Sequence, residues 1–160
     1  MIIRTASIRD LDDISQVEAL CFPPAEAADR ASIQRRLSVF PDRFWLLWEG
    51  DTLVSFVNGM LTDSPDLSDD MYEDSTLHTP EGAWQMIFGV DTIPAFRCQG
   101  CAEQILKKVI AQCKLENRRG IVLTCKEHLL HYYTKFGFQN EGISQSVHGN
   151  VQWYQMRLAF

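Results

Sequence analysis

The chain has 160 residues, of which 46% are hydrophobic and 22% charged. That balance is typical of one globular domain, so we expect residues 1–160 to form a single domain. A net charge of −6 and a pI near 5.1 argue against nucleic acid as a partner, because nucleic acids attract basic surfaces. No apolar run approaches the ~20 residues of a membrane span, and the N-terminal region turns acidic too early for a signal peptide. We therefore expect a cytoplasmic protein without a membrane partner.

The cysteines number five, an odd count that points to reduced thiols rather than a disulfide framework. Cys98 and Cys101 have the C-x-x-C spacing of metal ligands or of a redox pair. No second close pair accompanies them, so we expect no metal. Zinc or dithiol chemistry at this pair is the alternative.

The first forty residues predict a strand and two helices. Ile2 to Thr5 is typical of a short strand, and Ser7 with Asp10 has the spacing of a capping box. Apolar residues then recur at helical spacing as far as Cys21, where two prolines end the helix. A second, shorter helix is expected over residues 29–38.

The middle of the chain predicts a hairpin, a long loop and a buried strand. The aromatic run 44–48, the turn at Gly50 and Asp51, and a strand over 53–61 indicate the hairpin. Residues 63–82 are rich in Asp, Ser and Pro and form the expected loop. The segment 84–92 has the apolar character of a buried strand.

The last sixty residues alternate helices and strands. Apolar residues recur with the period of a strongly amphipathic helix from Gly100 onward, at positions 102, 105, 106, 109, 110 and 113. A buried parallel strand is expected at 121–123, a helix at 128–136 that ends at Gly137, and two strands near 138–143 and 151–158. This order predicts an α/β sandwich with a mixed sheet.

The segment from Gly89 to Leu106 gives the most specific prediction of function. Its pattern predicts a strand, a short turn and a long helix. A helix N-terminus presents unpaired N–H groups and a partial positive charge, which together can bind a phosphate. Gly100 allows an anion close to the backbone, and Arg97 adds a positive charge. An ordinary strand-to-helix connection is the alternative interpretation of the same residues.

Arg97-x-x-Gly100-x-Ala102 is similar to the R/Q-x-x-G-x-G/A signature of the GNAT superfamily of N-acetyltransferases. Ala95–Gly100 and Tyr133–Phe138 also resemble the serotonin (arylalkylamine) N-acetyltransferase branch and its bacterial relatives. The resemblance implies a GNAT-like α/β fold with a mixed, mostly antiparallel sheet of about seven strands and about four helices. In such folds the strands corresponding to those of Val90 and Leu123 splay apart as a parallel pair, and the cofactor inserts between them.

The resemblance also implies acetyl-CoA as cosubstrate. It assigns Val90, Asp91 and Thr92 to main-chain bonds with the pantetheine arm, and a backbone N–H near Val90 to the thioester carbonyl as an oxyanion site. It assigns the pyrophosphate to a loop and helix N-terminus made of Arg97, Cys98, Gln99, Gly100, Cys101, Ala102 and Glu103.

Acetyl transfer requires an amine that has lost its proton and a thiolate that gains one. Tyr133 matches the tyrosine that the resembling enzymes use as the acid, whereas a packing role in the core is the alternative. Tyr132 points another way on a helix and is the weaker candidate. Animal enzymes of this branch carry two histidines at the positions of Met86 and Phe88, which cannot carry a proton. The base is therefore left open.

The acceptor side has two candidate features. The loop from Asp63 to Glu81 carries seven acidic residues and no Lys or Arg, and its field would attract a cationic amine. A merely solvated loop is the alternative. The other feature is an apolar wall that we expect around an aryl or alkyl group, formed by Phe22, Pro23, Pro24, Tyr72 and Trp84.

Taken together, these features predict an N-acetyltransferase that moves the acetyl group of acetyl-CoA to a primary amine by direct attack in a ternary complex. A small (aryl)alkylamine or a polyamine is the expected acceptor, and the protein is expected to be a monomer or a homodimer. Two alternatives remain: acetylation of a protein N-terminus or lysine, and a non-catalytic acyl-CoA-binding sensor.

Overall fold

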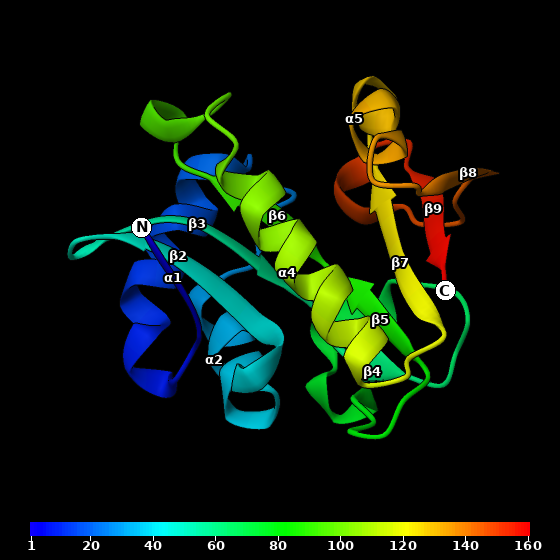
Figure 1. The fold of residues 1–160 in the computed structure, drawn as a ribbon, viewed down its shortest axis with the longest axis horizontal. Coiled ribbons are helices and arrows are strands. Elements are labelled where there is room, and N and C mark those ends of the chain that lie inside the picture. Colours follow the sequence, from blue (N-terminus) through cyan, green and yellow to red (C-terminus); the bar gives the residue numbers. More distant parts are fainter. The chain divides into compact units, whose positions relative to one another are not determined.

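The computed structural model describes all 160 residues and divides them between two compact units (Figure 1). One unit consists of Met1–Gly59 and Gly89–Ala111, and the other of Met60–Phe88 and Gln112–Phe160. The helix α4 (Cys101–Leu115) begins in the first unit and ends in the second. The single domain expected for residues 1–160 stays a prediction.

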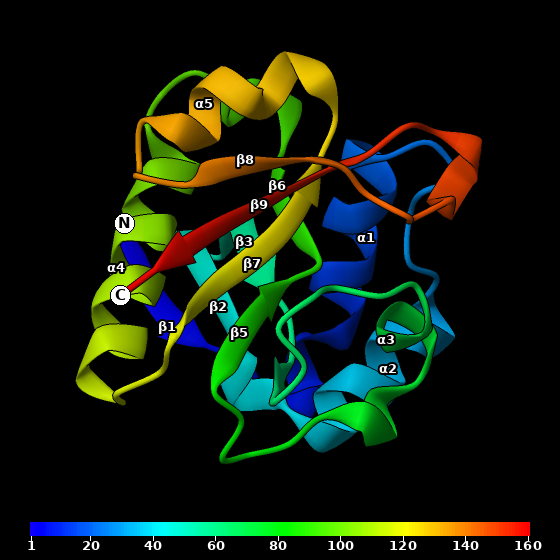
Figure 2. The same cartoon turned by 90° about the vertical axis from the view of Figure 1, so that its right-hand side faces the viewer.

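The first unit is a sheet with helices on both faces. Its strands are antiparallel in the order β1-β2-β3-β6. Helices α1 and α2 pack against each other on one face, and α4 begins on the opposite face (Figure 2). The other elements of this unit are β1 (Ile2–Thr5), α1 (Leu11–Cys21), α2 (Arg30–Val39), β2 (Phe44–Glu49), β3 (Thr52–Asn58) and β6 (Gly89–Thr92).

Local signals in the sequence fix the boundaries of the first two helices. The predicted capping box is present: the Ser7 hydroxyl and the Asp10 carboxylate each accept a backbone N–H of the turn that leads into α1. Asp10 also pairs with Arg4 at 2.8 Å. The helix α1 ends at Cys21, just before the two prolines, and Asp29 caps α2 by accepting the N–H of Ser32. These two helices are therefore confirmed within a residue of their expected bounds.

The second unit is a mixed sheet in the order β4-β5-β7-β9-β8. Only β5 and β7 run parallel, and every other pair is antiparallel. Its elements are β4 (Leu61–Thr62), α3 (Asp70–Glu73), β5 (Trp84–Ile87), β7 (Gly120–Cys125), α5 (Leu130–Thr134), β8 (Gln139–Ile143) and β9 (Tyr154–Ala159). The helix expected over 128–136 is a 3-10 turn, Glu127–Leu129, followed by the short α5.

Two expected strands are each interrupted, which turns about seven predicted strands into nine. The strand expected over 53–61 stops at Asn58 and resumes as β4. The strand expected over 84–92 breaks at Phe88, so that β5 pairs in parallel with β7 as far as Ile87 and Leu123, and β6 pairs with β3 alone. The expected mixed α/β fold is confirmed. No helix combines the length and the apolar character that crossing a membrane requires.

Candidate functional site

The predicted phosphate loop is a tight, exposed connection between β6 and α4. A 3-10 turn, Pro94–Phe96, leads into it, and Arg97 to Gly100 are all exposed. Cys98 and Gly100 adopt positive φ angles of 61° and 79°. When right-handed and left-handed backbone conformations alternate, successive N–H groups point toward the same side. At the start of a helix this produces an anion-binding concavity. The 15-residue helix that follows supplies a macrodipole.

Gly100 suits close approach of an anion. A Cβ added there would meet only the Glu103 carboxylate, at 3.9 Å, so the space in front of its backbone is open. Glu103 itself pairs with Lys107 at 3.4 Å, one turn further along the helix. The residues present therefore fit a pyrophosphate.

Arg97 is directed back along the strand that precedes it. Its Nε donates a 3.0 Å hydrogen bond to the carbonyl oxygen of Thr92, and Cys21 at the end of α1 donates its S–H to the same oxygen at 3.3 Å. The guanidinium also interacts with the Cys21 thiol, and a guanidinium carries five N–H donors in all.

The two cysteines of the C-x-x-C spacing lie in different environments. Cys98 is exposed, whereas Cys101 is buried at the first turn of α4, where burial and the nearby charge of Glu49 raise the pKa of its thiol. No group of three or more His, Cys, Asp or Glu side chains lies close enough to hold a metal ion. The pair therefore lacks the further ligands that a zinc site requires.

The strand β6 is the last strand of its sheet, so one of its edges is open to main-chain bonding. Val90 pairs with Val57, and Thr92 with Ser55, across the other edge. The Asp91 side chain is fully buried. The main-chain carbonyl oxygen of Asp91 accepts a hydrogen bond from the Ser55 hydroxyl at 2.6 Å. The edge can therefore bond an extended ligand, whereas the side chain of Asp91 is directed away from solvent.

Tyr133 is almost entirely buried in α5, with 6% of its surface exposed. Its ring meets those of Tyr132 and Phe138 edge-on, with centroid distances of 5.2 Å and 6.0 Å. The neighbouring Tyr132 instead packs with Phe136 and under the Lys135 ammonium, so the two tyrosines do face different surroundings.

An aromatic cluster that the sequence pattern did not reveal lies in the second unit. The Tyr72 ring is 4.9 Å from that of Phe88 and stacks on that of His148 at 5.1 Å. Trp153 continues the row at 6.2 Å from His148, and all four side chains are half-buried. The Tyr72 hydroxyl bonds the Thr124 hydroxyl at 3.1 Å. Phe88 is thus part of an accessible aromatic surface, whereas Met86 is buried.

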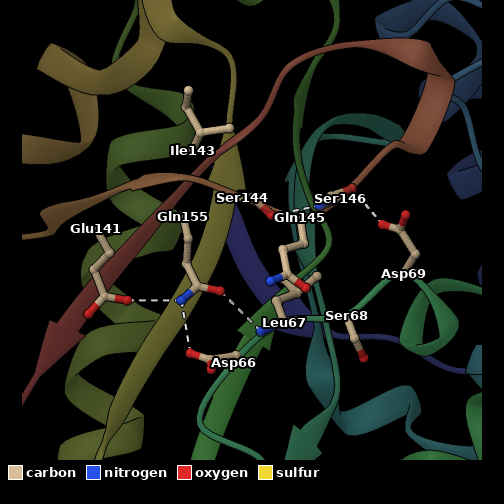
Figure 3. Close-up of a pocket in the computed structure, with 10 residues that line it drawn as sticks. All are labelled: Asp66, Leu67, Ser68, Asp69, Glu141, Ile143, Ser144, Gln145, Ser146 and Gln155. Carbon is tan, nitrogen blue, oxygen red and sulfur yellow. Dashed lines mark hydrogen bonds between the residues drawn. The ribbon is translucent and has the colours of Figure 1, made fainter.

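The acidic loop takes part in a polar pocket of about 450 Å³ (Figure 3). Asp66 pairs with Arg157 at 2.8 Å, and Asp69 accepts the Ser146 hydroxyl and the Val147 N–H. The pocket therefore joins the loop to the end of the β8–β9 hairpin. Its lining residues are Asp66, Leu67, Ser68, Asp69, Glu141, Ile143, Ser144, Gln145, Ser146 and Gln155.

Trp84 has a different environment from the one proposed for the apolar wall. Its ring packs under the guanidinium groups of Arg119 and Arg157, at 5.9 Å and 4.7 Å. Tyr72 and Phe88, by contrast, contact each other near the far end of β5. Tyr72 therefore contacts Phe88, which was not expected in the wall, whereas Trp84 packs against two cations.

Known proteins resemble the chain in sequence. The model of the acetyltransferase (GNAT) family matches residues 10–138. The serotonin N-acetyltransferase of Mesocricetus auratus is 28% identical over 126 residues, which cover 78% of this chain. The match spans 59% of the length of that relative.

Solved structures share the fold at low sequence identity. A GNAT-like decarboxylase, GphF, in complex with isobutyryl-CoA superposes with a TM-score of 0.86 at 22% identity, covering 99% of each chain. The loading GNATL domain of CurA from Lyngbya majuscula gives 0.84 at 18% identity, covering 99% of this chain and 96% of the other. The ribosomal-protein-S18-alanine N-acetyltransferase of Escherichia coli gives 0.74 at 13%, covering 99% and 92%. Because the family model matches most of the chain, the protein belongs to the acetyltransferase (GNAT) family.

Proposed function

We propose that this protein is an acetyl-CoA-dependent N-acetyltransferase whose acceptor is a small primary amine. One observation carries the proposal: the exposed loop from Arg97 to Gly100 contains two left-handed residues and leads directly into the longest helix of the chain, which begins at Cys101. That geometry is suited to a pyrophosphate. The residues assigned to it are Arg97, Cys98, Gln99, Gly100, Cys101, Ala102 and Glu103.

The open edge of β6 supports the same cosubstrate. Val90, Asp91 and Thr92 present the main-chain groups that bond the pantetheine arm, and a backbone N–H near Val90 stabilises the oxyanion of the tetrahedral intermediate. An extended arm along a strand edge gains hydrogen bonds without side-chain contacts. The side chain of Asp91 therefore plays no part in holding the cosubstrate.

Tyr133 is the proposed general acid that protonates the departing thiolate. Its buried ring, fixed by edge-on contacts with Tyr132 and Phe138, gives the hydroxyl a defined direction, which acid catalysis requires. The same contacts are those of a packing residue, so the role is tested with a variant that keeps the ring.

The aromatic cluster of Tyr72, Phe88, His148 and Trp153 favours an arylalkylamine as acceptor. Half-buried rings in a row offer stacking surface for an aryl group, worth about 0.5–1.5 kcal/mol for each well-placed ring pair. The acidic loop adds attraction for an ammonium ion. This combination supports assignment to the serotonin (arylalkylamine) N-acetyltransferase branch and its bacterial relatives.

Acetylation of a protein N-terminus is the second candidate function. The structural relatives include a ribosomal-protein alanine acetyltransferase and a decarboxylase, so likeness of fold does not select the reaction. A peptide acceptor would use the polar pocket that the acidic loop shares with the β8–β9 hairpin, rather than the aromatic cluster.

The proposal is tested by release of coenzyme A thiol from acetyl-CoA in the presence of an acceptor panel. The panel contains an arylalkylamine, a polyamine, an aliphatic amine and a peptide with a free N-terminus. Saturable thiol release with the arylalkylamine above all others supports the proposal. Release with the peptide alone supports the second candidate, and binding of acetyl-CoA without release under any condition contradicts both.

A further inference from the structure

The main-chain carbonyl oxygen of Thr92 accepts hydrogen bonds from two segments that lie far apart in the sequence. Arg97 donates its Nε–H to this oxygen at 3.0 Å from the phosphate loop, and Cys21 donates its S–H at 3.3 Å from the end of α1. A carbonyl oxygen has two lone pairs, so both are used within the protein. All three residues belong to the first unit.

The Thr92 carbonyl lies on the open edge of β6. Ile93, which follows this strand, donates its N–H to the Val54 carbonyl of β3. Successive residues of an antiparallel strand alternate between bonding the partner strand and facing away from it, so Asp91 faces β3 while Val90 and Thr92 face the open edge. Because the Thr92 carbonyl is already occupied, its N–H is the group that remains for an extended ligand.

The thiol and the guanidinium also contact each other. Burial is the largest effect on the Cys21 thiol and raises its pKa, whereas a hydrogen bond with Arg97 works against that rise. The raised pKa keeps the thiol protonated at neutral pH, so it donates to the carbonyl while its sulfur accepts from the guanidinium. The carbonyl, the thiol and the guanidinium therefore form a closed network of three groups.

This network gives the Arg97 side chain a support that an exposed arginine otherwise lacks. Arg97 is exposed, whereas Cys21 is half-buried at the end of an 11-residue helix. A long side chain loses conformational freedom when it binds a ligand, and this loss lowers the affinity. Contacts that hold the guanidinium before binding reduce the loss. The thiol is thus a fixed point from which the guanidinium can be held.

We propose that Cys21 is a positioning residue for the pyrophosphate of coenzyme A, because it holds the Arg97 guanidinium against the Thr92 carbonyl. This assignment rests on the proposed function, in which Arg97 contacts the pyrophosphate. Cys21 acts through Arg97 and makes no contact of its own with the cosubstrate. The Thr92 carbonyl serves the same network and is not among the groups that bond the pantetheine arm.

The test compares two ligands, one with the pyrophosphate and one without it. Coenzyme A is measured by isothermal titration calorimetry, and pantetheine, which is the arm alone, by competition with coenzyme A. Cys21→Ala removes the thiol, Cys21→Val fills its space without a donor, and Cys21→Ser keeps both a donor and an acceptor. Each variant is also made in an Arg97→Ala background, and thermal unfolding establishes that it is folded.

Cys21→Ala and Cys21→Val should each weaken coenzyme A binding by about three- to tenfold, the usual net contribution of one hydrogen bond. Cys21→Ser should restore most of the affinity, and pantetheine should bind every Cys21 variant as it binds the wild type. In the Arg97→Ala background the same substitutions should have no further effect, because two residues that act through one contact are not additive.

Three results would overturn the role of Cys21: losses that add to that of Arg97→Ala, equal losses with pantetheine, or unchanged coenzyme A binding without the thiol. If Cys21→Ala does not fold, the comparison of Cys21→Val with Cys21→Ser decides in the same way. A wild type that binds neither ligand would instead overturn the proposed function on which the assignment rests.

Discussion

Asp69 accepts the backbone N–H of Val147 at 3.0 Å and so joins the acidic loop to the turn that carries His148. The Ser146 hydroxyl donates to the same carboxylate. His148 in turn stacks on Tyr72, so the aromatic cluster depends on a contact made by one of the acidic residues. The acids of this loop therefore divide into those that hold structure and those that only contribute charge.

Glu73 and Glu81 are the acids suited to a test of electrostatic steering, because both are exposed. Glu73→Gln with Glu81→Gln should raise the KM of a cationic amine and flatten its dependence on salt, with the KM of acetyl-CoA unchanged. Asp69→Asn serves as the structural comparison and should lower thermal stability. Amine kinetics that ignore both the double substitution and salt would mean that the loop is only a solvated surface.

Gly100→Val is expected to weaken coenzyme A binding by at least tenfold in isothermal titration calorimetry, because the new side chain enters the open space in front of the backbone. Valine at φ 79° is also strained, by about 1–3 kcal/mol. Gly50→Val is the matched control, since Gly50 has a φ of 57° and nothing within 4 Å of its added Cβ. A similar loss of affinity in both variants, or none in either, would argue against the phosphate loop.

The sequence predicted elements whose signals are local. The capping box at Ser7 and Asp10, the proline stop after Cys21 and the periodicity of α4 all act within one or two helical turns. Such signals depend on neighbouring residues alone, so the pattern and the structure agree. The loop Arg97–Glu103 belongs to the same class, because both the glycine and the helix start are visible in the chain.

The remaining features depend on contacts between residues distant in sequence. Nothing in an apolar run marks the break at Phe88, which arises because β5 and β6 pair with different strands. The carboxyl next to that of Asp91 belongs to Glu18, which lies on a helix far away in the sequence. The sequence pattern of that helix would place an acidic residue on the solvent-exposed face. Trp84 looked like a ligand-facing aromatic, and its cationic partners come from residues 119 and 157.

Tyr133→Phe should lower kcat by roughly 10²–10⁴, the range of positioned acid catalysis, and leave acetyl-CoA affinity nearly unchanged. The ring contacts with Tyr132 and Phe138 persist in phenylalanine, so the variant tests the hydroxyl alone. Tyr132→Phe is the control and should cost much less. A wild-type kcat in the Tyr133 variant, under conditions where chemistry limits the rate, would mean that the tyrosine only packs.

Asp91→Asn should change how stability varies with pH. The pKa of Asp91 is raised in the folded protein, so its stabilising contribution is complete below the unfolded pKa of about 3.9 and is lost as pH rises through the folded pKa. The free energy of unfolding of the wild type should therefore fall relative to the variant across that window, by up to about 1.4 kcal/mol per pH unit.

Urea unfolding at a series of pH values measures that difference. The pKa values of Asp10 and Glu141 are lowered by their arginine partners, and their stabilising contributions are lost instead as pH falls. Those contributions are the same in both proteins, so subtracting the two curves isolates Asp91. Parallel curves for wild type and Asp91→Asn would mean that this carboxyl titrates alike in the folded and unfolded chains.

Transfer of a labelled acetyl group distinguishes an N-acetyltransferase from a protein that only binds coenzyme A. The protein is mixed with acetyl-CoA carrying an isotopically labelled acetyl group and with a 2-arylethylamine, and the products are identified by mass spectrometry. We expect the label on the amine nitrogen, in amounts equal to the free thiol, with rates that saturate in both substrates. Free thiol without labelled amide, or an unchanged mixture while coenzyme A binding persists, would contradict that expectation.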